Sequence, residues 1–229
     1  MKNLKYTITA FFLSLGFFAN AQNEANFALE GGNSFLTIKQ KFDGKIKGSL
    51  FINENFENVK IDDIPIQYPA RYNGYTDNFE VKHMGKVKYI VPSLESKVLV
   101  HFINSNKTYK IYNYLYKGDL KAGFFVILSK GKNYDFTLKE KVVYVEEQKP
   151  KTPYEKYKNP ELKRVKDTYY LRLKGSEALN EIKLRKKDVI KFFGNDSKMV
   201  SSLIKKNKLN VKKEEDMIQL LKLYDNQTR

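Results

Sequence analysis

The 229-residue sequence contains no cysteine. A chain without thiols cannot form disulfides, use a thiolate as a nucleophile or bind a metal through sulfur, so its stability must come from an ordinary hydrophobic core. Histidine is also scarce, with only His83 and His101. No HxH or HxxxH spacing joins them, and two isolated histidines, even combined with Asp62 or Asp63, do not define a coordination shell. We therefore expect no metal site.

Catalytic motifs are equally scarce. The sequence has no Gly-x-Ser-x-Gly, and Gly131-Lys132 lacks the remaining residues of a phosphate-binding loop. No pair of carboxylates can be identified that would face each other as general acid and base. We assign no catalytic residue and no cofactor-binding residue, and we expect no cofactor.

An uncharged apolar run, TITAFFLSLGFF, occupies residues 7–18. Twelve residues are short for the roughly 20 that span a bilayer. The run follows Lys2 and Lys5 and precedes Ala19-Asn20-Ala21, an order typical of a cleaved secretory signal. We expect a signal peptide at residues 1–21, export to the periplasm, either free or associated with the outer membrane, and no transmembrane span after cleavage.

Short segments in which apolar and polar residues alternate fill residues 27–145 and are rich in Val, Ile, Tyr and Phe. This pattern predicts eight or nine antiparallel strands. Turn residues lie between them at Asp43-Gly44, Met84-Gly85, Lys117-Gly118 and Lys130-Gly131. The fold class is therefore mainly β with a helical C-terminus. Residues 22–148 are predicted to form an antiparallel meander, either a sandwich or a half-barrel.

The pattern changes after residue 148. Three prolines and alternating charges predict an extended connector at residues 149–166. Residues 167–229 begin with DTYYLRLKG, a strand for which LNEIKL is the candidate hairpin partner. Amphipathic patterns then predict helices at 186–193, 197–206 and 212–224. Gly194 can end the first helix, and Asp196 or Ser197 can cap the second.

Positive charge is concentrated in this last part of the chain. Residues 22–148 contain 18 basic and 15 acidic residues, whereas residues 149–229 contain 22 basic and 11 acidic residues. In an exported protein the available polyanions are lipid phosphates, lipopolysaccharide and acidic proteins, so we expect no nucleic-acid partner. The candidate docking residues are Lys205, Lys206, Lys208, Lys212 and Lys213. The alternative is a solvated surface that only keeps the protein soluble.

Tyrosines form a row in TYKIYNYLYKG. Tyr112, Tyr114 and Tyr116 share one face of the predicted strand, and Tyr109 lies on the other. Tyrosine suits a surface that meets a protein or a glycan, because the ring buries a large area while the hydroxyl stays hydrated. Tyrosine is also common in half-exposed sheets for its β-propensity alone, so both interpretations stay open.

RYNGYTDNFEV, at residues 71–81, is predicted to be a structural corner. Pro65 and Pro69 precede it and suit an edge or a strand entry, because proline offers no N–H to a neighbouring strand. Asn73-Gly74 supplies a position that tolerates a positive φ.

The charged residues of this stretch allow two interpretations. In the corner, Arg71 and Asp77 can pair across the bend, with Tyr72, Tyr75 and Phe79 packed around them. The alternative is a site in which Arg71 binds an anion and Asp77 acts as a base. That site lacks a histidine, a nucleophile or a second carboxylate at a recognisable spacing, so we expect the corner.

The run RYNGYTDNFE, the GFFVILSKGK segment and the lysine-rich C-terminal NKLNVKKEEDMIQLLKLYD together resemble a group of uncharacterised exported Bacteroidota envelope proteins. In that group a run RYN-x-Y-x-D-x-[FM]-E recurs, and the chain ends in a lysine-rich helical segment. The resemblance implies a shared fold and transfers no catalytic residue.

Three functional hypotheses follow. The first is a non-catalytic periplasmic or outer-membrane-associated accessory protein, with a β scaffold and a basic helical tail that docks on an envelope protein or an anionic membrane or glycan surface. The second is a module that binds a lipid, glycan or peptide in an apolar cavity of a curved sheet. The third is an envelope hydrolase of unrecognised type. We expect the first.

Overall fold

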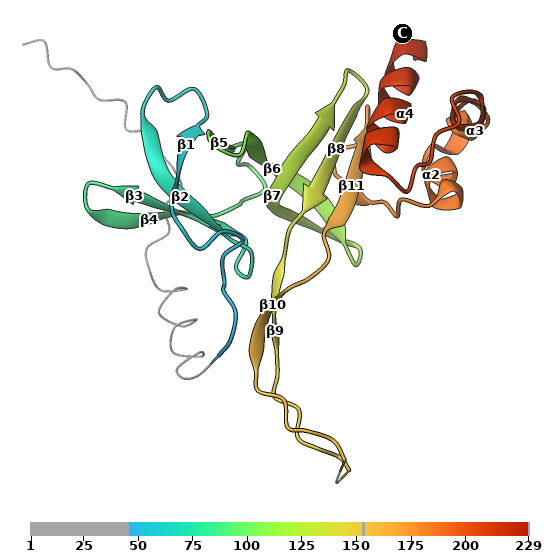
Figure 1. Ribbon diagram of the computed structural model, residues 1–229. Helices are drawn as coiled ribbons and strands as arrows, with labels where there is room; N and C mark the ends of the chain where they lie inside the picture. Colours follow the sequence, from blue (N-terminus) through green and yellow to red (C-terminus); the bar gives the residue numbers. More distant parts are fainter. Residues whose placement is uncertain (1–45, 153, 229) are drawn as a thin grey trace, which may run out of the picture.

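The computed structural model describes residues 46–152 and 154–228 (Figure 1). The predicted signal peptide and residues 22–45 of the predicted meander lie outside them. The chain is mainly β with helices at its C-terminal end, as predicted. The strands are β1 (Glu57–Ile61), β2 (Gln67–Asn73), β3 (Asn78–His83), β4 (Lys86–Ile90), β5 (Leu99–Phe102), β6 (Lys107–Tyr116), β7 (Asp119–Lys130), β8 (Tyr134–Lys139), β9 (Val142–Val145), β10 (Glu161–Arg164), β11 (Thr168–Leu173) and β12 (Asn180–Glu181). The helices are α2 (Lys186–Phe192), the 3-10 helix η1 (Gly194–Asp196), α3 (Ser197–Lys206) and α4 (Glu214–Gln227).

Ten strands form one antiparallel sheet in the order β12-β11-β8-β7-β6-β5-β1-β2-β3-β4. Two hairpins have the predicted two-residue turns. Met84 and Gly85 have φ of 48° and 71°, and Lys117 and Gly118 have φ of 53° and 91°. Consecutive positive φ values match the right-handed twist of the flanking strands, so these dipeptides fix the register of both hairpins.

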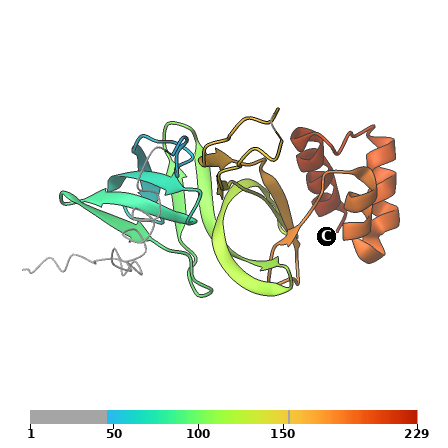
Figure 2. The same ribbon diagram turned by 90° about the horizontal axis from the view of Figure 1, so that it is seen from below.

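One half of the sheet curls until it meets itself, and Figure 2 shows the curvature of these strands. Just before β12, the Leu179 N–H donates to the Asn113 carbonyl at 2.8 Å, and the Leu115 N–H donates to the Leu179 carbonyl at 3.0 Å. We name β6, β7, β8, β11 and β12 the strand ring. Its interior is filled by Tyr112, Phe125, Tyr170 and Leu179, with Tyr114 packed against them. Two shapes were open for the predicted meander, a sandwich and a half-barrel. The structure resembles the half-barrel.

The other half of the sheet folds over the outer face of β6 and β7. Alternate residues of β1, β2, β3 and β5 meet the outward-facing residues of the ring in one aromatic core. Phe79 lies at the centre, with its ring 4.8 Å from that of Phe124 and 5.1 Å from that of Tyr72. Both faces of the long strands β6 and β7 are therefore buried. One face lines the interior of the strand ring, and the other contacts the aromatic core.

Helices α2, α3 and α4 cover the outer face of β8 and β11 (Figure 1). Phe136 and Leu171 of the sheet pack with Val189, Leu220 and Leu221 of the helices in a single buried cluster. The sheet thus continues across the boundary predicted at residue 148, and the helical segment completes its core.

Further contacts tie the end of α4 to the β7–β8 turn. There the Asp225 carboxylate accepts the Lys132 and Asn133 N–H groups at 3.1 and 2.8 Å. The last helix is therefore fixed to the sheet by polar contacts as well as by its buried apolar face.

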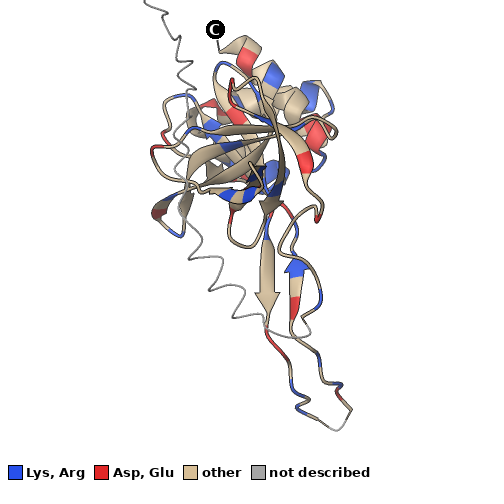
Figure 3. Cartoon of the chain, turned by 90° about the vertical axis from the view of Figure 1, so that its left-hand side faces the viewer, with Lys and Arg blue, Asp and Glu red and all other residues tan. Residues whose placement is uncertain are grey.

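The predicted connector has a different form in the structure. β9 and β10 pair with each other and make a two-stranded arm, residues 142–152 and 154–164, that projects away from the sheet (Figures 1 and 3). The chain leaves the sheet after β8 and returns to it as β11, so the arm is an insertion between two neighbouring strands. Gly48, with φ of 91°, lies directly against the arm at Leu162. Glycine is needed at this position, because any side chain would collide with the Leu162 carbonyl.

Helix boundaries agree closely with the predicted ranges. Gly194, which follows α2, has φ of 51°, consistent with its predicted role at the helix end. Asp196 is the N-cap residue of α3, but its side chain makes no capping hydrogen bond. Its carboxylate instead accepts the Tyr224 hydroxyl at 2.8 Å, so it joins α4 to α3.

Candidate functional site

Five lysines surround the turn between α3 and α4, and we name them the lysine cluster. All five are exposed: Lys205, Lys206, Lys208, Lys212 and Lys213. The turn itself is fixed, since Leu203, Ile204 and Val211 are buried in the helical core. Asn207 closes α3 through its side-chain amide, which donates to the Leu203 carbonyl at 2.9 Å. Rigid backbone therefore presents the flexible charged side chains.

No ion pair involves these five lysines in the part of the chain that the structure describes. Three acidic residues follow at the start of α4, and two of them bond elsewhere. Glu214 accepts the Tyr169 hydroxyl at 3.1 Å, and Asp216 accepts the Asn210 N–H at 2.7 Å. Glu215 is the exposed acidic residue beside the cluster. Hydrogen bonds from a hydroxyl and an N–H group do not neutralise a carboxylate, so three negative charges lie beside the five ammonium groups. The cluster keeps a smaller net positive charge.

The tyrosine row lies mostly inside the strand ring. Tyr112 is buried, and its hydroxyl donates at 3.2 Å to the Asp135 carboxylate. The same carboxylate also binds Arg172. Burial, together with the Asp135 charge, raises the pKa of Tyr112 well above its ordinary value. Tyr114 packs edge-on against Tyr170, whereas Tyr116 is exposed at the hairpin end. Tyr112 therefore has no face to offer a partner, and Tyr116 is the accessible member of the row.

The RYNGYTDNFEV stretch forms the end of β2, a turn and most of β3. The predicted Arg71–Asp77 pair is wrong. Arg71 pairs with Glu80, its cross-strand partner, at 2.7 Å, and its guanidinium lies 3.5 Å from the Phe51 ring centroid. Because side chains directly opposite in antiparallel strands are closest, Glu80 outcompetes a carboxylate across the turn.

Asn73 organises the turn that follows. Its side-chain oxygen accepts the N–H groups of Tyr75 and Thr76 at 3.0 and 3.1 Å. The positive φ occurs at Asp77, at 59°, and not at Gly74. Gly74 serves instead for close packing, since a Cβ would lie 2.9 Å from the Ile52 side chain.

Asp77 connects the turn to the strand ring. Its carboxylate accepts the Tyr72 hydroxyl at 2.6 Å and the Phe124 N–H at 3.2 Å, and it pairs with Lys139 at 2.5 Å. Lys139 also donates to the Phe124 carbonyl at 2.9 Å. Burial lowers the pKa of Lys139, and the Asp77 charge opposes that shift. These bonds join the two halves of the molecule. Gly123 leaves space for them, because a Cβ at this position would lie 2.6 Å from both the Asp77 carboxylate and the Lys139 ammonium group.

Glu140 organises a second buried cluster at the base of the arm. Its carboxylate binds Lys107 at 3.0 Å, Arg164 at 2.6 Å and the Tyr109 hydroxyl. Burial and the Glu140 charge raise the pKa of Tyr109 well above its ordinary value. Because Arg164 belongs to β10 and Lys107 to β6, the cluster holds the arm to the sheet.

The two histidines lie on different strands, His83 at the end of β3 and His101 in β5. His101 Nδ1 lies 2.8 Å from the Thr108 hydroxyl, and the His83 ring meets Tyr68 edge-on. Asp62 accepts the Leu99 N–H at 2.8 Å. Within residues 46–152 and 154–228 no group of His, Asp or Glu is suited to hold a metal ion.

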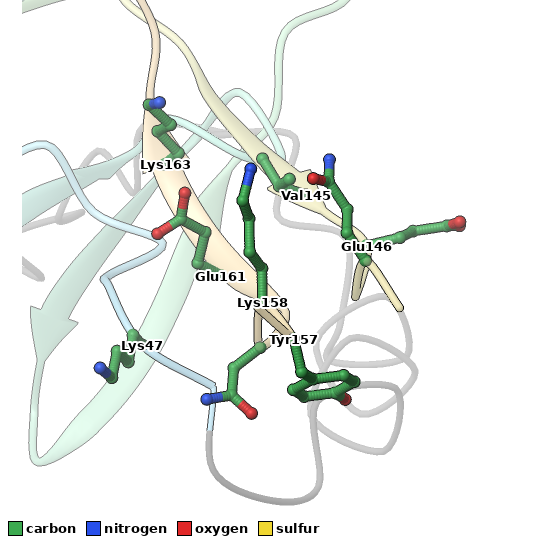
Figure 4. A pocket seen from close by; sticks show the side chains of 9 residues that line it. Lys47, Val145, Glu146, Tyr157, Lys158, Glu161 and Lys163 are labelled. Atoms are coloured by element: carbon green, nitrogen blue, oxygen red, sulfur yellow. The ribbon is translucent and has the colours of Figure 1, made fainter. Parts of the chain in front are cut away.

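Among the open clefts on the described part of the chain, two have charged linings. One, of about 430 Å³, lies along the arm, where Lys47, Lys158 and Lys163 alternate with Glu146 and Glu161 (Figure 4). The other, of about 340 Å³, lies between α2 and the segment around Ile182. Charges of both signs line each cleft. The interior of the strand ring, where the ligand-binding hypothesis requires an apolar cavity, is occupied by aromatic side chains.

Comparisons of the chain with protein-family models, with curated proteins and with solved structures find no match. The resemblance to exported Bacteroidota proteins thus stays an expectation. No helix in the described residues is long and apolar enough to cross a membrane.

Sequence reasoning missed Lys139 and Glu140, the residues on which the buried clusters depend. It also missed the exposed Leu115 and Leu120, which face each other at the end of the β6–β7 hairpin. The sequence pattern could have identified the two leucines as exposed, because they flank a predicted two-residue turn at the far end of two long strands.

Proposed function

We propose that this protein is a non-catalytic interaction protein of the cell envelope, in which the sheet is a scaffold and the lysine cluster docks on an anionic surface. The observation that carries the proposal is the cluster itself, with five exposed lysines that no ion pair neutralises in the described chain. The envelope location rests on the N-terminal sequence, whose pattern is that of an export signal.

The fold changes how such docking would work. The helices share a buried core with β8 and β11, so the basic segment is held in a fixed orientation and is not a loose tail. A preorganised cluster loses less freedom on binding than a flexible tail does. Each lysine near an anionic surface contributes about 1 kcal/mol, so five together correspond at best to a dissociation constant of roughly a few tenths of a millimolar. Repulsion of Glu214, Glu215 and Asp216 by the same surface weakens the binding further. The cluster alone therefore supports weak, salt-sensitive docking.

The test is sedimentation of the purified mature protein with isolated envelope fragments over a salt series. A variant with the five cluster lysines changed to glutamine should bind at least about tenfold more weakly, and wild-type binding should weaken as salt rises. The matched control carries the same charge change at five exposed lysines that form no ion pair within the described residues: Lys60, Lys86, Lys88, Lys97 and Lys151. Equal loss in both variants would show that only net charge matters, and no loss in either would refute the proposal.

A further inference from the structure

The end of the β6–β7 hairpin carries an apolar surface that the fold does not cover. Leu115 and Leu120 are cross-strand partners, exposed to 42% and 46%. They continue the face of β6 and β7 that lines the aromatic core. On these two strands the buried core residues end at Ile111 and Phe124, and Ala122 packs against the edge of the core. Leu94 is exposed on the neighbouring segment, whose backbone carbonyl accepts the Asn113 side-chain amide at 3.3 Å. Two exposed leucines therefore face each other beyond the edge of the core, and the Leu94 backbone is held beside Asn113 on the same strand.

The opposite face of the same hairpin end is aromatic and basic. Tyr116 is exposed, and two ammonium groups lie over its ring, Lys121 at 4.9 Å and Lys117 at 5.6 Å from the centroid. Asp119 is the one acidic residue between positions 110 and 130. Lysines with long apolar stems and a tyrosine with a wet hydroxyl are the side chains that suit the boundary between lipid headgroups and acyl chains.

We propose that this hairpin end, residues 115–121, inserts into the interfacial region of an anionic lipid bilayer. The leucines would enter the acyl boundary, Tyr116 would lie at the headgroup level, and Lys117 and Lys121 would meet lipid phosphates. Residues 115–121 are all exposed around a tight turn, so the hairpin end can penetrate a deformable surface without a complementary pocket. The proposal rests on the proposed function and names lipid as one component of the anionic surface.

The chain lacks tryptophan, which makes single-tryptophan variants clean reporters of insertion. Leu120→Trp places the reporter at the hairpin end, and Ile66→Trp places it at an exposed apolar residue elsewhere, 59% accessible. Vesicles of phosphatidylglycerol and phosphatidylcholine supply the anionic bilayer, and pure phosphatidylcholine is the neutral comparison. We expect a blue shift for Leu120→Trp on anionic vesicles only, and none for Ile66→Trp.

A second pair of variants tests the role of the leucines without introducing a tryptophan, a residue that itself favours the membrane interface. Leu115→Asn with Leu120→Asn should weaken sedimentation with anionic vesicles by roughly tenfold or more, since insertion scales with buried apolar area. Ile66→Asn with Val87→Asn, changed at residues of similar exposure, should have no effect. Urea midpoints of all variants establish that each is folded.

The outcomes separate this proposal from the proposed function. If the protein sediments with anionic vesicles while the fluorescence of the Leu120→Trp variant stays unshifted, the hairpin proposal is overturned and docking through the lysine cluster stands. If the protein binds envelope fragments but no vesicles, lipid is excluded as the occupant, and the anionic surface is that of a protein or glycan. A shift that grows with protein concentration in the absence of vesicles would assign the hairpin end to a second copy of the chain instead.

Discussion

The Asp77–Lys139 ion pair can be tested with one substitution, Asp77→Asn. Asparagine accepts the left-handed backbone conformation at this position, where φ is 59°, so the turn itself should persist. The change removes the negative charge that faces Lys139 and weakens the acceptor for the Tyr72 hydroxyl and the Phe124 N–H. The lysine is then left charged and nearly buried.

The expected loss of stability depends on how far the ion pair is exposed to solvent. Removing one partner of a buried ion pair costs about 3–5 kcal/mol. Here the side chains are 12% exposed for Lys139 and 24% exposed for Asp77. Water can therefore compensate part of the lost interaction, and we expect a loss of about 2–3 kcal/mol in the free energy of unfolding at pH 7.

The pH dependence has a definite sign. Burial lowers the pKa of Lys139 in the folded protein, and Asp77 opposes that shift, so the substitution should lower this pKa further. Between the folded-state pKa and the ordinary value of 10.5 the unfolded chain binds more protons, and stability rises with pH. The variant should therefore recover part of its loss relative to the wild type between about pH 7 and pH 9.5.

Urea denaturation at both pH values measures these differences. Asp63→Asn, at an exposed turn residue, is the control and should change stability by less than about 0.5 kcal/mol. Adding Lys139→Met to Asp77→Asn should restore part of the stability, because no charge then remains buried. A loss below about 0.5 kcal/mol for Asp77→Asn, independent of pH, would refute the structural role of the pair.

Two further predictions concern the tyrosines and the helices. Burial raises the pKa of Tyr169, Tyr170 and Tyr224 to about 12, above their ordinary value of 10, so stability should be full below pH 10 and fall as pH rises toward 12. Ultraviolet titration with urea midpoints at about pH 9 and 11 measures this, and ionisation of every tyrosine near pH 10 in the folded protein would contradict it. Deleting residues 184–229 should unfold or aggregate the sheet, since α2–α4 cover Phe136 and Leu171. A soluble truncated protein with an unchanged urea midpoint would show that the helices do not complete the core.

Local patterns predicted the elements well. The helix expected at 197–206 has the bounds of α3, and the strand expected around the tyrosine row is β6. Met84-Gly85 and Lys117-Gly118 form the predicted turns. Such features depend on residues within one or two turns of the chain, and their propensities and periodicities agree with the final fold.

Long-range partners could not be read in the same way. Lys139 lies 62 residues from Asp77, and Arg164 lies 24 residues from Glu140. Nothing in the sequence marks Gly123 as the position that admits a buried ion pair. The return of the chain from the arm into β11 likewise depends on pairing with β8, so the predicted connector gave no indication of one continuous sheet.

The most direct test of the docking surface is lysine footprinting of the unmodified protein. Amine acetylation is measured residue by residue by mass spectrometry, with and without envelope fragments. We expect Lys205, Lys206, Lys208, Lys212 and Lys213 to become protected, while exposed lysines of the far sheet edge, Lys86 and Lys88, react as before. Protection confined to lysines outside the cluster would contradict the proposed docking surface.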